Sequence, residues 1–433
     1  MPEPGFHAWR SVADIVGVAL TRRLLRHDSA PIAIGLSGGG DSLALLIAAH
    51  RWAVTAGRPL IALTVDHGLQ AAGRDWAPWC RARAERLGIE HRTLYWRGDK
   101  PATGLPAAAR AARHALLADA ARRAGSAVIL LGHTADDCLE AQAMRAAGAR
   151  VSAPRGWAPS PAWPEGRGLF LLRPLLASRR ADLRAWLEVL GETWIEDPAN
   201  LDPASGRAQA RRRLQGGGCS PPETPGPMAA HFLPAVNEGV AGELIIDRKA
   251  FTPDFGDVAR TMLRAALLCA AGTARPPRGA RLDRLVALIG SGVPFVATLA
   301  GARVEGAPDV IRIMAGDGDH RRGREIGLAL PLDEEVVFEG RFCLRAARPG
   351  LIAHRLAGRL GQLDPVQRRA LAAAPPRARG ALPCLATEDA RRVTCATLVD
   401  SADIAVRSLI MPRLAAACGA INDEATIRAW QNR

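Results

Sequence analysis

The first half of the chain alternates between short apolar runs and longer segments in which apolar residues recur every three or four positions. The short runs, bounded by glycine, proline or polar residues, are typical of buried strands, and the longer segments are typical of helices. Such alternation indicates a mostly parallel sheet with crossover helices, a doubly wound α/β fold. The predicted strands cover residues 31–36, 59–66, 89–95 and 126–132, and the predicted helices cover residues 7–26, 42–54, 74–87, 106–124 and 135–147.

A further strand and helix follow at residues 169–172 and 179–190, before a stretch rich in glycine and proline at residues 216–228 that is typical of a linker. We therefore expect an α/β domain over residues 1–215, a helical domain over residues 229–320 and a C-terminal α+β domain over residues 321–433. Beyond the linker the pattern predicts helices at residues 256–272, 279–290 and 401–418, strand-like pieces at 295–304 and 309–314, and a hairpin at 335–344 that turns at Glu339-Gly340, while residues 355–380 stay unassigned.

A glycine-rich turn, Ser37-Gly38-Gly39-Gly40-Asp41-Ser42, joins the first predicted strand to its helix. A strand that runs through glycines into a helix presents free backbone N–H groups, which suit a phosphate. Asp41 would repel a phosphate unless a divalent cation lay between them, so its presence indicates Mg²⁺. The turn lacks the lysine of a Walker A loop and the spacing of a dinucleotide fingerprint. A glycine turn without a ligand is the simplest alternative.

Two other segments end predicted strands, Asp66-His67-Gly68 and Gly132-His133-Thr134. In doubly wound sheets ligands bind beyond the carboxyl ends of the strands. We therefore expect these segments and the glycine turn to converge on one rim of the sheet.

The net charge of +14 indicates what kind of partner the chain binds. Nearly all of the positive charge is arginine, because Lys100 and Lys249 are the only lysines. Arginine pairs bidentately with phosphate, so the charge favours a polyanionic partner. No apolar run is long enough for a transmembrane helix and the N-terminus lacks a secretory pattern, so no membrane partner and a cytoplasmic location are expected. The eight cysteines are scattered without a CxxC pair.

The glycine turn resembles the SGGxDS loop of the N-type ATP pyrophosphatases, the PP-loop superfamily. Further segments are similar to those of one family within it, the tRNA(Ile)-lysidine synthetases, and the match covers about residues 28–214. His114 stands where that family usually has tyrosine, and Cys138 where glutamine is common. The matching segments are Val65–Leu69, Ala109–His114, Gly132–Glu140, Arg173–Leu176 and Trp194–Asp202.

The resemblance implies ATP and Mg²⁺ as cofactors, and L-lysine and a tRNA(Ile) with a CAU anticodon as partners. It implies that ATP adenylates the C2 oxygen of the wobble cytidine, after which the lysine amine displaces AMP to give lysidine. Residues 1–215 would then be catalytic, 229–320 would bind substrate and 321–433 would be a candidate for tRNA binding. The sequence does not fix the oligomeric state, and a homodimer is one state that it allows.

By the same resemblance the site residues fall into overlapping groups. Asp137 and Glu140 lie three apart on one predicted helix face, which suits an ammonium group; stabilisation of the helix dipole is the simpler alternative. The ATP-binding residues would be Ser37, Gly38, Gly39, Gly40, Asp41, Ser42, Asp66, His67 and His133, with Asp41 as the Mg²⁺ ligand. The catalytic residues would be Asp41, Arg110, Arg113, Asp137 and Glu140, and the lysine-binding residues Asp137, Glu140, Asn200 and Arg207.

Three other functions remain as alternatives at this point. A tRNA thiolase of the same superfamily would need reactive cysteines, and the absence of a CxxC pair counts against it. An amidating ligase acting on small molecules would gain nothing from the positive charge. An RNA-binding module without catalysis would not need Asp41 in the glycine turn.

Overall fold

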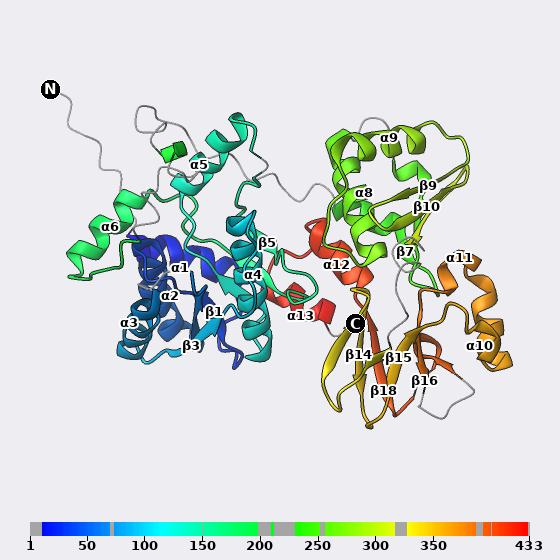
Figure 1. Ribbon diagram of the computed structural model, residues 1–433. Coiled ribbons are helices and arrows are strands. Elements are labelled where there is room, and N and C mark those ends of the chain that lie inside the picture. The colour runs from blue at the N-terminus through cyan, green and yellow to red at the C-terminus, as the bar shows by residue number, and fades with distance from the viewer. Residues whose placement is uncertain are drawn as a thin grey trace. The chain divides into compact units, whose positions relative to one another are not determined.

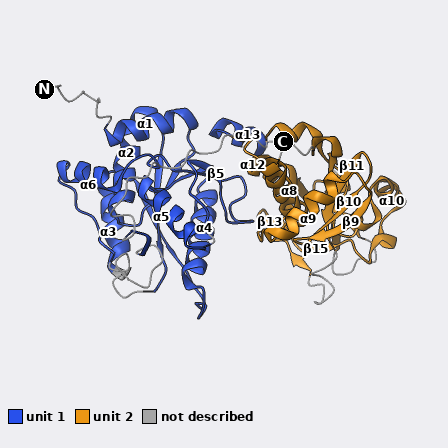
Figure 2. Ribbon diagram, turned by 90° about the horizontal axis from the view of Figure 1, so that it is seen from above, with its two compact units in different colours: residues 1–225, 422–433 blue, residues 226–421 orange. Residues whose placement is uncertain are grey.

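The computed structural model describes residues 11–69, 73–149, 151–197, 209–211, 230–251, 256–316, 327–386, 393–399 and 401–431. The chain divides into two compact units (Figure 2). Unit 1 comprises Met1–Pro225 and Asn422–Arg433, and unit 2 comprises Gly226–Ile421. Among the described residues, no helix is both long and apolar enough to span a membrane. The predicted linker, residues 216–228, lies outside the described residues, and the predicted three-domain division stays a prediction.

Unit 1 is built on a six-stranded sheet with the order β3-β2-β1-β4-β6-β5 (Figure 1). All neighbours pair in parallel except β5, which runs antiparallel to β6. The predicted doubly wound, mostly parallel α/β fold is therefore confirmed. The strands are β1 (Ile32–Gly35), β2 (Leu60–Asp66), β3 (Glu90–Tyr95), β4 (Val128–Leu130), β5 (Trp157–Pro159) and β6 (Phe170–Leu172), and the helices are α1 (Val12–Arg23), α2 (Gly40–Ala56), α3 (Gly73–Arg86), α4 (Leu105–Arg123), α5 (Ala135–Ala146), α6 (Arg180–Val189) and α13 (Glu424–Gln431).

The central strand β1 sets the position of the site. It pairs with β2 on one side and with β4 on the other, so the connections after β1 and β4 leave the sheet at a point where the strand order reverses. Such a switch point opens a crevice at the carboxyl ends of the strands, where doubly wound proteins bind their ligands. The glycine turn follows β1 and the Gly132–Thr134 segment follows β4, as the sequence predicts.

The central strands β1, β2, β4 and β6 are buried on both faces because they are apolar at successive positions. Ala33 of β1 belongs to a cluster with Leu117 and Ala121 of α4. Ile32 and Ile34, which alternate with Ala33, point to the opposite face and are also fully buried. Helix packing on each face holds the strand ends of the switch point rigidly in place.

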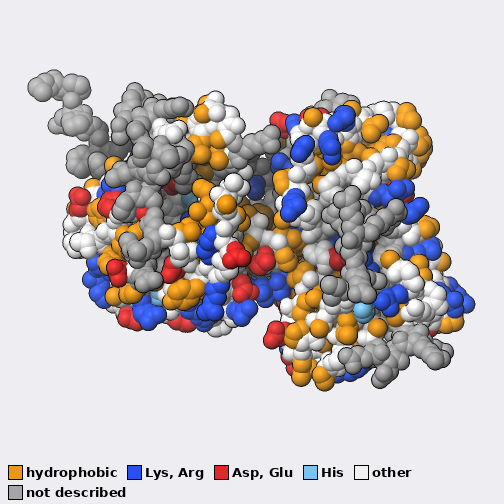
Figure 3. Space-filling model, in the orientation of Figure 1, with side chains coloured by type: hydrophobic (Ala, Val, Ile, Leu, Met, Phe, Trp, Pro, Cys, Tyr) orange, Lys and Arg blue, Asp and Glu red, His pale blue; other side chains and the backbone are white. Residues whose placement is uncertain are grey.

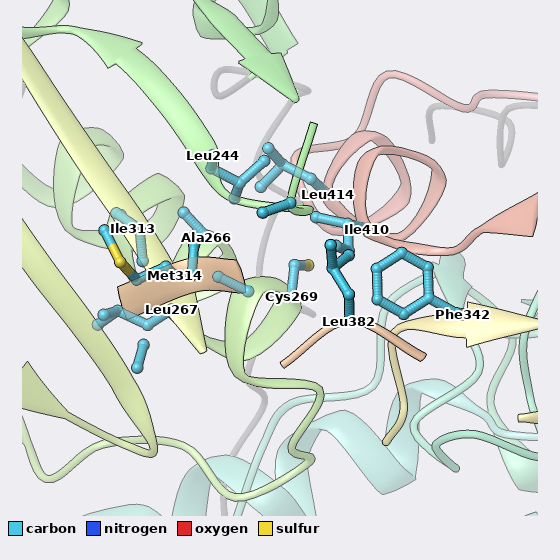
Figure 4. Close-up of a cluster of buried hydrophobic side chains, with 14 of the residues drawn as sticks. Leu244, Ala266, Leu267, Cys269, Ile313, Met314, Phe342, Leu382, Ile410 and Leu414 are labelled. Atoms are coloured by element: carbon cyan, nitrogen blue, oxygen red, sulfur yellow. The ribbon is translucent and has the colours of Figure 1, made fainter. Parts of the chain in front are cut away.

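The described residues of unit 2 form three antiparallel sheets, with the orders β7-β8-β11-β10-β9, β12-β15-β16-β17 and β13-β14-β18. One continuous hydrophobic cluster includes residues from all three sheets and from α8 and α12; Figure 4 shows part of it, including Leu244, Leu267, Phe342 and Leu414. The helical and α+β extension is thus confirmed. The helices are α8 (Gly256–Ala271), α9 (Gly279–Gly290), α10 (Pro365–Ala370), α11 (Pro376–Arg379) and α12 (Ile410–Ala417).

The strands of unit 2 are short. They are β7 (Val236–Glu238), β8 (Leu244–Asp247), β9 (Phe295–Leu299), β10 (Ala302–Gly306), β11 (Val310–Ala315), β12 (Leu328–Ala329), β13 (Glu335–Phe338), β14 (Phe342–Ala346), β15 (Ile352–Arg355), β16 (Pro383–Ala386), β17 (Thr394–Cys395) and β18 (Ile404–Ser408).

Two predictions for unit 2 were wrong in detail. Residues 295–304, expected as one strand-like piece, form the hairpin of β9 and β10, because Ala300 and Gly301 turn the chain with φ of 52° and 82°. The expected helix at 401–418 begins only at Ile410, since residues 404–408 form β18 and pair with β14. The predicted turn at Glu339-Gly340 is confirmed, with β13 and β14 on either side.

Helix α13 is joined to the rest of unit 1 by a buried ion pair. Arg58 donates to both carboxylate oxygens of Glu424, at 2.9 and 3.0 Å, and the two side chains are 0% and 2% exposed. Arg58 also donates to the carbonyls of Leu25 and Ala30, and Glu424 accepts from the Leu25 amide. Removing one partner of a buried ion pair strongly destabilises a protein, because the other charge stays buried without compensation.

We predict that Glu424→Gln lowers the free energy of unfolding of unit 1 by about 3 kcal/mol or more, because it leaves the Arg58 charge buried without a counter-charge. All ten tryptophans lie in unit 1, so urea denaturation followed by tryptophan fluorescence reports on that unit. The control is Glu90→Gln, which removes an exposed ion pair with Arg92 and should change stability by less than about 0.5 kcal/mol. Equal effects of the two substitutions would contradict the prediction.

Candidate active site

The glycine turn forms a tight connection between β1 and α2. Gly38 has φ of 86°, a left-handed conformation that favours glycine, and Gly39 caps the helix that begins at Gly40. The Ser42 hydroxyl donates to the Gly39 carbonyl at 2.8 Å and accepts from the Ser37 amide at 3.2 Å. The first amides of a helix have no partner inside it, so the start of α2 is a site for an anion.

Two other segments pack directly against this turn. The Ile195 amide donates to the Gly38 carbonyl at 3.0 Å. A Cβ added at Gly132, in the connection after β4, would lie 2.8 Å from the backbone oxygen of Asp41. Only glycine permits this close approach, which brings the start of α5 alongside the start of α2.

Three carboxylates, Asp41, Asp137 and Glu140, gather around the side chain of Arg180; we call the three the acidic cluster. Arg180 Nε donates to Asp41 Oδ2 at 2.9 Å and Nη1 to Glu140 Oε1 at 3.3 Å, while Nη2 lies 3.8 Å from Asp137 Oδ2. Arg211 Nε donates to the same Glu140 oxygen. The structure therefore unites acidic residues from α2 and α5 with cations that follow β6.

Glu140 is the most deeply buried carboxylate of the acidic cluster, and Arg180 and Arg211 both bind its Oε1 atom. Glu140 is 1% exposed, and its Oε2 atom is buried without a hydrogen-bond partner among the described residues. A buried carboxylate oxygen without a partner is costly, and a cation with N–H donors would satisfy it.

The neighbouring carboxylates also have local structural roles. Asp137 accepts from the Thr134 amide at 2.9 Å, which completes a capping box at the start of α5. Asp136 accepts from the Arg180 amide at 2.8 Å and from the Arg179 side chain at 2.9 Å. Asp136 thus holds the start of α6 in place, in addition to its favourable position near the α5 dipole.

Burial and charge act in opposite directions on the acidic cluster. Burial raises the pKa of Asp41, and the Arg180 guanidinium partly counters that rise. Burial alone would lower the pKa of Arg180, but the charges of Asp41, Asp137 and Glu140 outweigh it and raise that pKa. Arg180 is therefore a permanent cation whose partners can be exchanged but whose charge cannot be lost.

A second set of side chains lies near the carboxyl ends of β4 and β6. We call it the basic group, and its members are Arg110, Arg113, His133, Arg155 and Arg173. Arg173 Nε donates to His133 Nδ1 at 3.1 Å, and its Nη1 donates to the Arg155 carbonyl at 2.8 Å. Burial lowers the pKa of Arg173 to about 10, and repulsion from Arg110, Arg155 and Arg113 adds to this shift. Cations held this close together favour binding of an anion.

His114 lies beside the same basic group. Burial lowers its pKa to about 3, with further repulsion from Arg113 and Arg110, so His114 is neutral at physiological pH. It fills the position where the sequence departs from the usual tyrosine without adding to the positive charge.

The third predicted segment of the rim is Asp66-His67-Gly68, after β2. Asp66 Oδ1 accepts from the Gly68 amide at 2.8 Å and so shapes the turn. His67 packs edge-on against Trp96, with ring centroids 5.9 Å apart. Burial lowers the pKa of His67, and the charge of Arg113 lowers it further, which connects this segment to the basic group.

The predicted site residues therefore fall into two neighbouring groups plus the glycine turn. Asp41, Asp137 and Glu140 share Arg180, whereas His133 accepts from Arg173 and the charges of Arg110 and Arg113 act on the same arginine. Asp66 and His67 form a further segment, which the charge of Arg113 reaches. Asn200 and Arg207 lie outside the described residues.

Sequence reasoning missed Arg173 and Arg180 as parts of the site. A signal for Arg180 was available: Arg179 and Arg180 begin a helix, where positive charge opposes the helix dipole and needs acidic partners elsewhere. The position of Arg173 beside His133 depends on the pairing of β4 with β6, which no local sequence pattern predicts.

The residues present fit a nucleotide and a hard divalent cation. The amides of the glycine turn and the basic group would hold phosphates, and Asp41 offers a carboxylate beside them. Within the described residues no three His, Cys, Asp or Glu side chains form a metal site of their own. Mg²⁺ is commonly bound through one or two carboxylates together with substrate phosphates, so Asp41 fits that use.

Comparisons with known proteins agree with this site. The PP-loop domain family matches residues 16–216. The tRNA(Ile)-lysidine synthase of Caulobacter vibrioides is 45% identical over 416 residues, covering 95% of this chain and 98% of that protein. The enzyme of the same name from Hyphomonas neptunium is 40% identical, covering 66% of this chain and 81% of that protein.

A likeness among solved structures is more distant. The U34-tRNA thiolase NcsA from Methanococcus maripaludis is 19% identical, covers 47% of this chain and 70% of that chain, and has a TM-score of 0.38, which is too low to add to the assignment. The family is shown by the Caulobacter vibrioides relative, which matches along nearly the whole chain. By that match, this chain belongs to the tRNA(Ile)-lysidine synthase family.

Proposed function

We propose that this chain ligates L-lysine to C2 of the wobble cytidine of a tRNA(Ile) with a CAU anticodon, converting ATP to AMP and pyrophosphate. The observation that carries the proposal is the acidic cluster beside the glycine turn, in a chain 45% identical over 95% of its length to a tRNA(Ile)-lysidine synthase. The glycine turn suits the triphosphate of ATP, and the acidic cluster suits the ammonium group of lysine.

The first chemical step would form a bond between the cytidine C2 oxygen and the α-phosphorus of ATP, releasing pyrophosphate. Backbone amides at the start of α2 would bind phosphate oxygens, and the basic group would stabilise the charge that develops on the α-phosphate. Asp41 would hold Mg²⁺, which when bound neutralises phosphate charge. Arg110, Arg113 and Arg173 would orient the phosphates or the tRNA backbone.

The second step would form the C–N bond and break the C2–O bond. The amine of lysine has a pKa near 10.4, so it reaches the site as an ammonium group and must lose protons to attack. Asp137 and Glu140 would bind that ammonium group, and the unpartnered Glu140 Oε2 is the atom suited to accept a proton. The C2 oxygen leaves as part of AMP.

The described cysteines give no support to a thiolase. Cys80 and Cys138 are the cysteines in the described part of unit 1, and both are buried. Burial raises the pKa of Cys80 to about 11 and raises that of Cys138 as well. Thiols with raised pKa values are protonated at neutral pH and are poor nucleophiles.

Unit 2 offers exposed cations for a nucleic acid. Arg368 and Arg369 on α10 and Arg377 on α11 are exposed, and Figure 3 shows Lys and Arg side chains over this part of unit 2. Such residues support tRNA binding by residues 321–433 through contacts to phosphates. A cytoplasmic location and a homodimer stay predictions from the sequence.

The direct test is to incubate the purified chain with ATP, Mg²⁺, labelled lysine and a tRNA(Ile) transcript with a CAU anticodon, and to analyse the nucleosides after digestion. We expect labelled lysidine and one AMP for each lysine incorporated. A matched transcript with a uridine at the wobble position should remain unlabelled. Labelled lysine recovered elsewhere, or ADP as the nucleotide product, would exclude the proposed reaction.

We predict that Asp41→Asn lowers the rate of AMP formation by about 100-fold or more, since a group that organises charge at the α-phosphate is lost. Filter binding of the tRNA should stay within about twofold, because exposed arginines dominate such binding. The control is Asp182→Asn, an exposed carboxylate on α6, which should retain full activity. Loss of tRNA binding together with activity would assign Asp41 a structural role instead.

We predict that Glu140→Gln raises the KM for lysine about tenfold or more and leaves the KM for ATP within about twofold. The reason is that a hydrogen bond between charged groups contributes about 1.5–3 kcal/mol. Steady-state lysidine formation at varied lysine and varied ATP separates the two values. Glu188→Gln, an exposed change on α6, serves as the control. An unchanged KM for lysine would remove Glu140 from the lysine site.

A further inference from the structure

Arg180 fills the acidic cluster in the structure. Its guanidinium contacts Asp41, Glu140 and Asp137, at 2.9, 3.3 and 3.8 Å, which are the carboxylates that the proposed reaction needs for Mg²⁺ and for lysine. We propose that Arg180 is a positioning residue that couples the two substrates: it neutralises the acidic cluster until a polyphosphate on the glycine turn draws its side chain away. The inference rests on the proposed function, and it implies that ATP binds before lysine.

The backbone of Arg180 is fixed, so only its side chain can respond. Its amide donates to Asp136 at 2.8 Å, and Arg179 holds the same carboxylate at 2.9 Å. Leu183 and Leu187 anchor α6 with 0% exposure. The Arg180 side chain is 21% exposed, which leaves it room to change partners.

Charge explains why Arg180 would oppose the binding of lysine. With Arg180 in place, its positive charge offsets one of the three negative charges of the acidic cluster. An incoming ammonium group is then attracted less strongly, and it competes with Arg180 for the same carboxylate oxygens. Once the Arg180 side chain has left, the site is more negative by one charge and Glu140 Oε1 loses a donor, so an ammonium group binds more favourably.

The position of Asp41 explains why a polyphosphate would release Arg180. Asp41 belongs to the glycine turn and to the first turn of α2. The Arg180 guanidinium is therefore hydrogen-bonded to the segment that would bind the polyphosphate. Arginine binds phosphate oxygens bidentately and strongly. A divalent cation on Asp41 would compete with Arg180 for that carboxylate. Both effects weaken the contact between Arg180 and Asp41 and favour the departure of the side chain from the cluster.

The coupling is measured by binding alone, without turnover. Equilibrium dialysis of labelled lysine is performed on the full chain with Mg²⁺, in the presence and absence of an ATP analogue with a methylene bridge between the α- and β-phosphates. We expect the analogue to tighten lysine binding about tenfold, within the usual range of such couplings. Lysine should tighten binding of the analogue by the same factor, because coupling is reciprocal.

The decisive variant is Arg180→Met, which removes the charge and keeps an unbranched side chain. We expect lysine to bind more tightly than in the wild type when no nucleotide is present, the analogue to bind more weakly, and the coupling factor to fall to about one. Arg180→Lys should restore part of the coupling. Arg145→Met, an exposed change on α5, is the matched control and should leave all three quantities unchanged.

A merely structural role for Arg180 gives a different result. Both affinities would then fall together in Arg180→Met, and tryptophan fluorescence would report lower stability of unit 1; that outcome overturns the inference. An unchanged coupling factor in Arg180→Met, or a wild type that makes lysidine without any coupling, also overturns it while the proposed function stands. A wild type that neither binds lysine with the analogue nor makes lysidine overturns both.

Discussion

The contacts of Arg180 with Asp41 and Glu140 are the interaction on which the site depends. They join three βα connections that are far apart in the chain: the turn after β1, the start of α5 after β4, and the start of α6 after β6. Asp136 fixes the backbone of α6 at the same place. The site is therefore a network of ion pairs that connects the carboxyl ends of three strands of the sheet.

Gly132 makes this network geometrically feasible. The close approach of Gly132 to the backbone of Asp41 sets the distance between the first turns of α2 and α5. Each of these turns supplies acidic residues, and each would otherwise repel the other. The intervening guanidinium groups allow the carboxylates to lie together, and this arrangement leaves Glu140 Oε2 without a hydrogen-bond partner in the described part of the chain.

The sequence predicts the architecture of unit 1 well because its signals are local. Apolar strands, glycine turns and amphipathic helices can each be predicted from a pattern of a few residues. The carboxyl ends of parallel strands then meet on one rim because of the topology alone. The partners of Arg173 and Arg180 were not predictable in this way, since they belong to other βα connections that are distant in the sequence, although the position of Arg180 at a helix start indicates that it needs acidic partners. In unit 2, β18 was mistaken for helix because its pairing with β14 overrides a weak local preference, and the β9–β10 hairpin was missed because Ala300 is an unusual residue at positive φ.

The pairing of Arg58 with Glu424 has a consequence for the order in which the chain is made. Arg58 is synthesised well before its counter-charge, which is encoded 366 positions later, after the whole of unit 2. Domains generally fold as units while the chain is being synthesised, beginning from the N-terminus. Unit 2 is thus complete before unit 1 has received its last helix, and a nascent chain holds this arginine without its native carboxylate until synthesis has passed residue 424. Any chain interrupted before that point lacks a part of its α/β unit, although the break falls far from the glycine turn in the sequence.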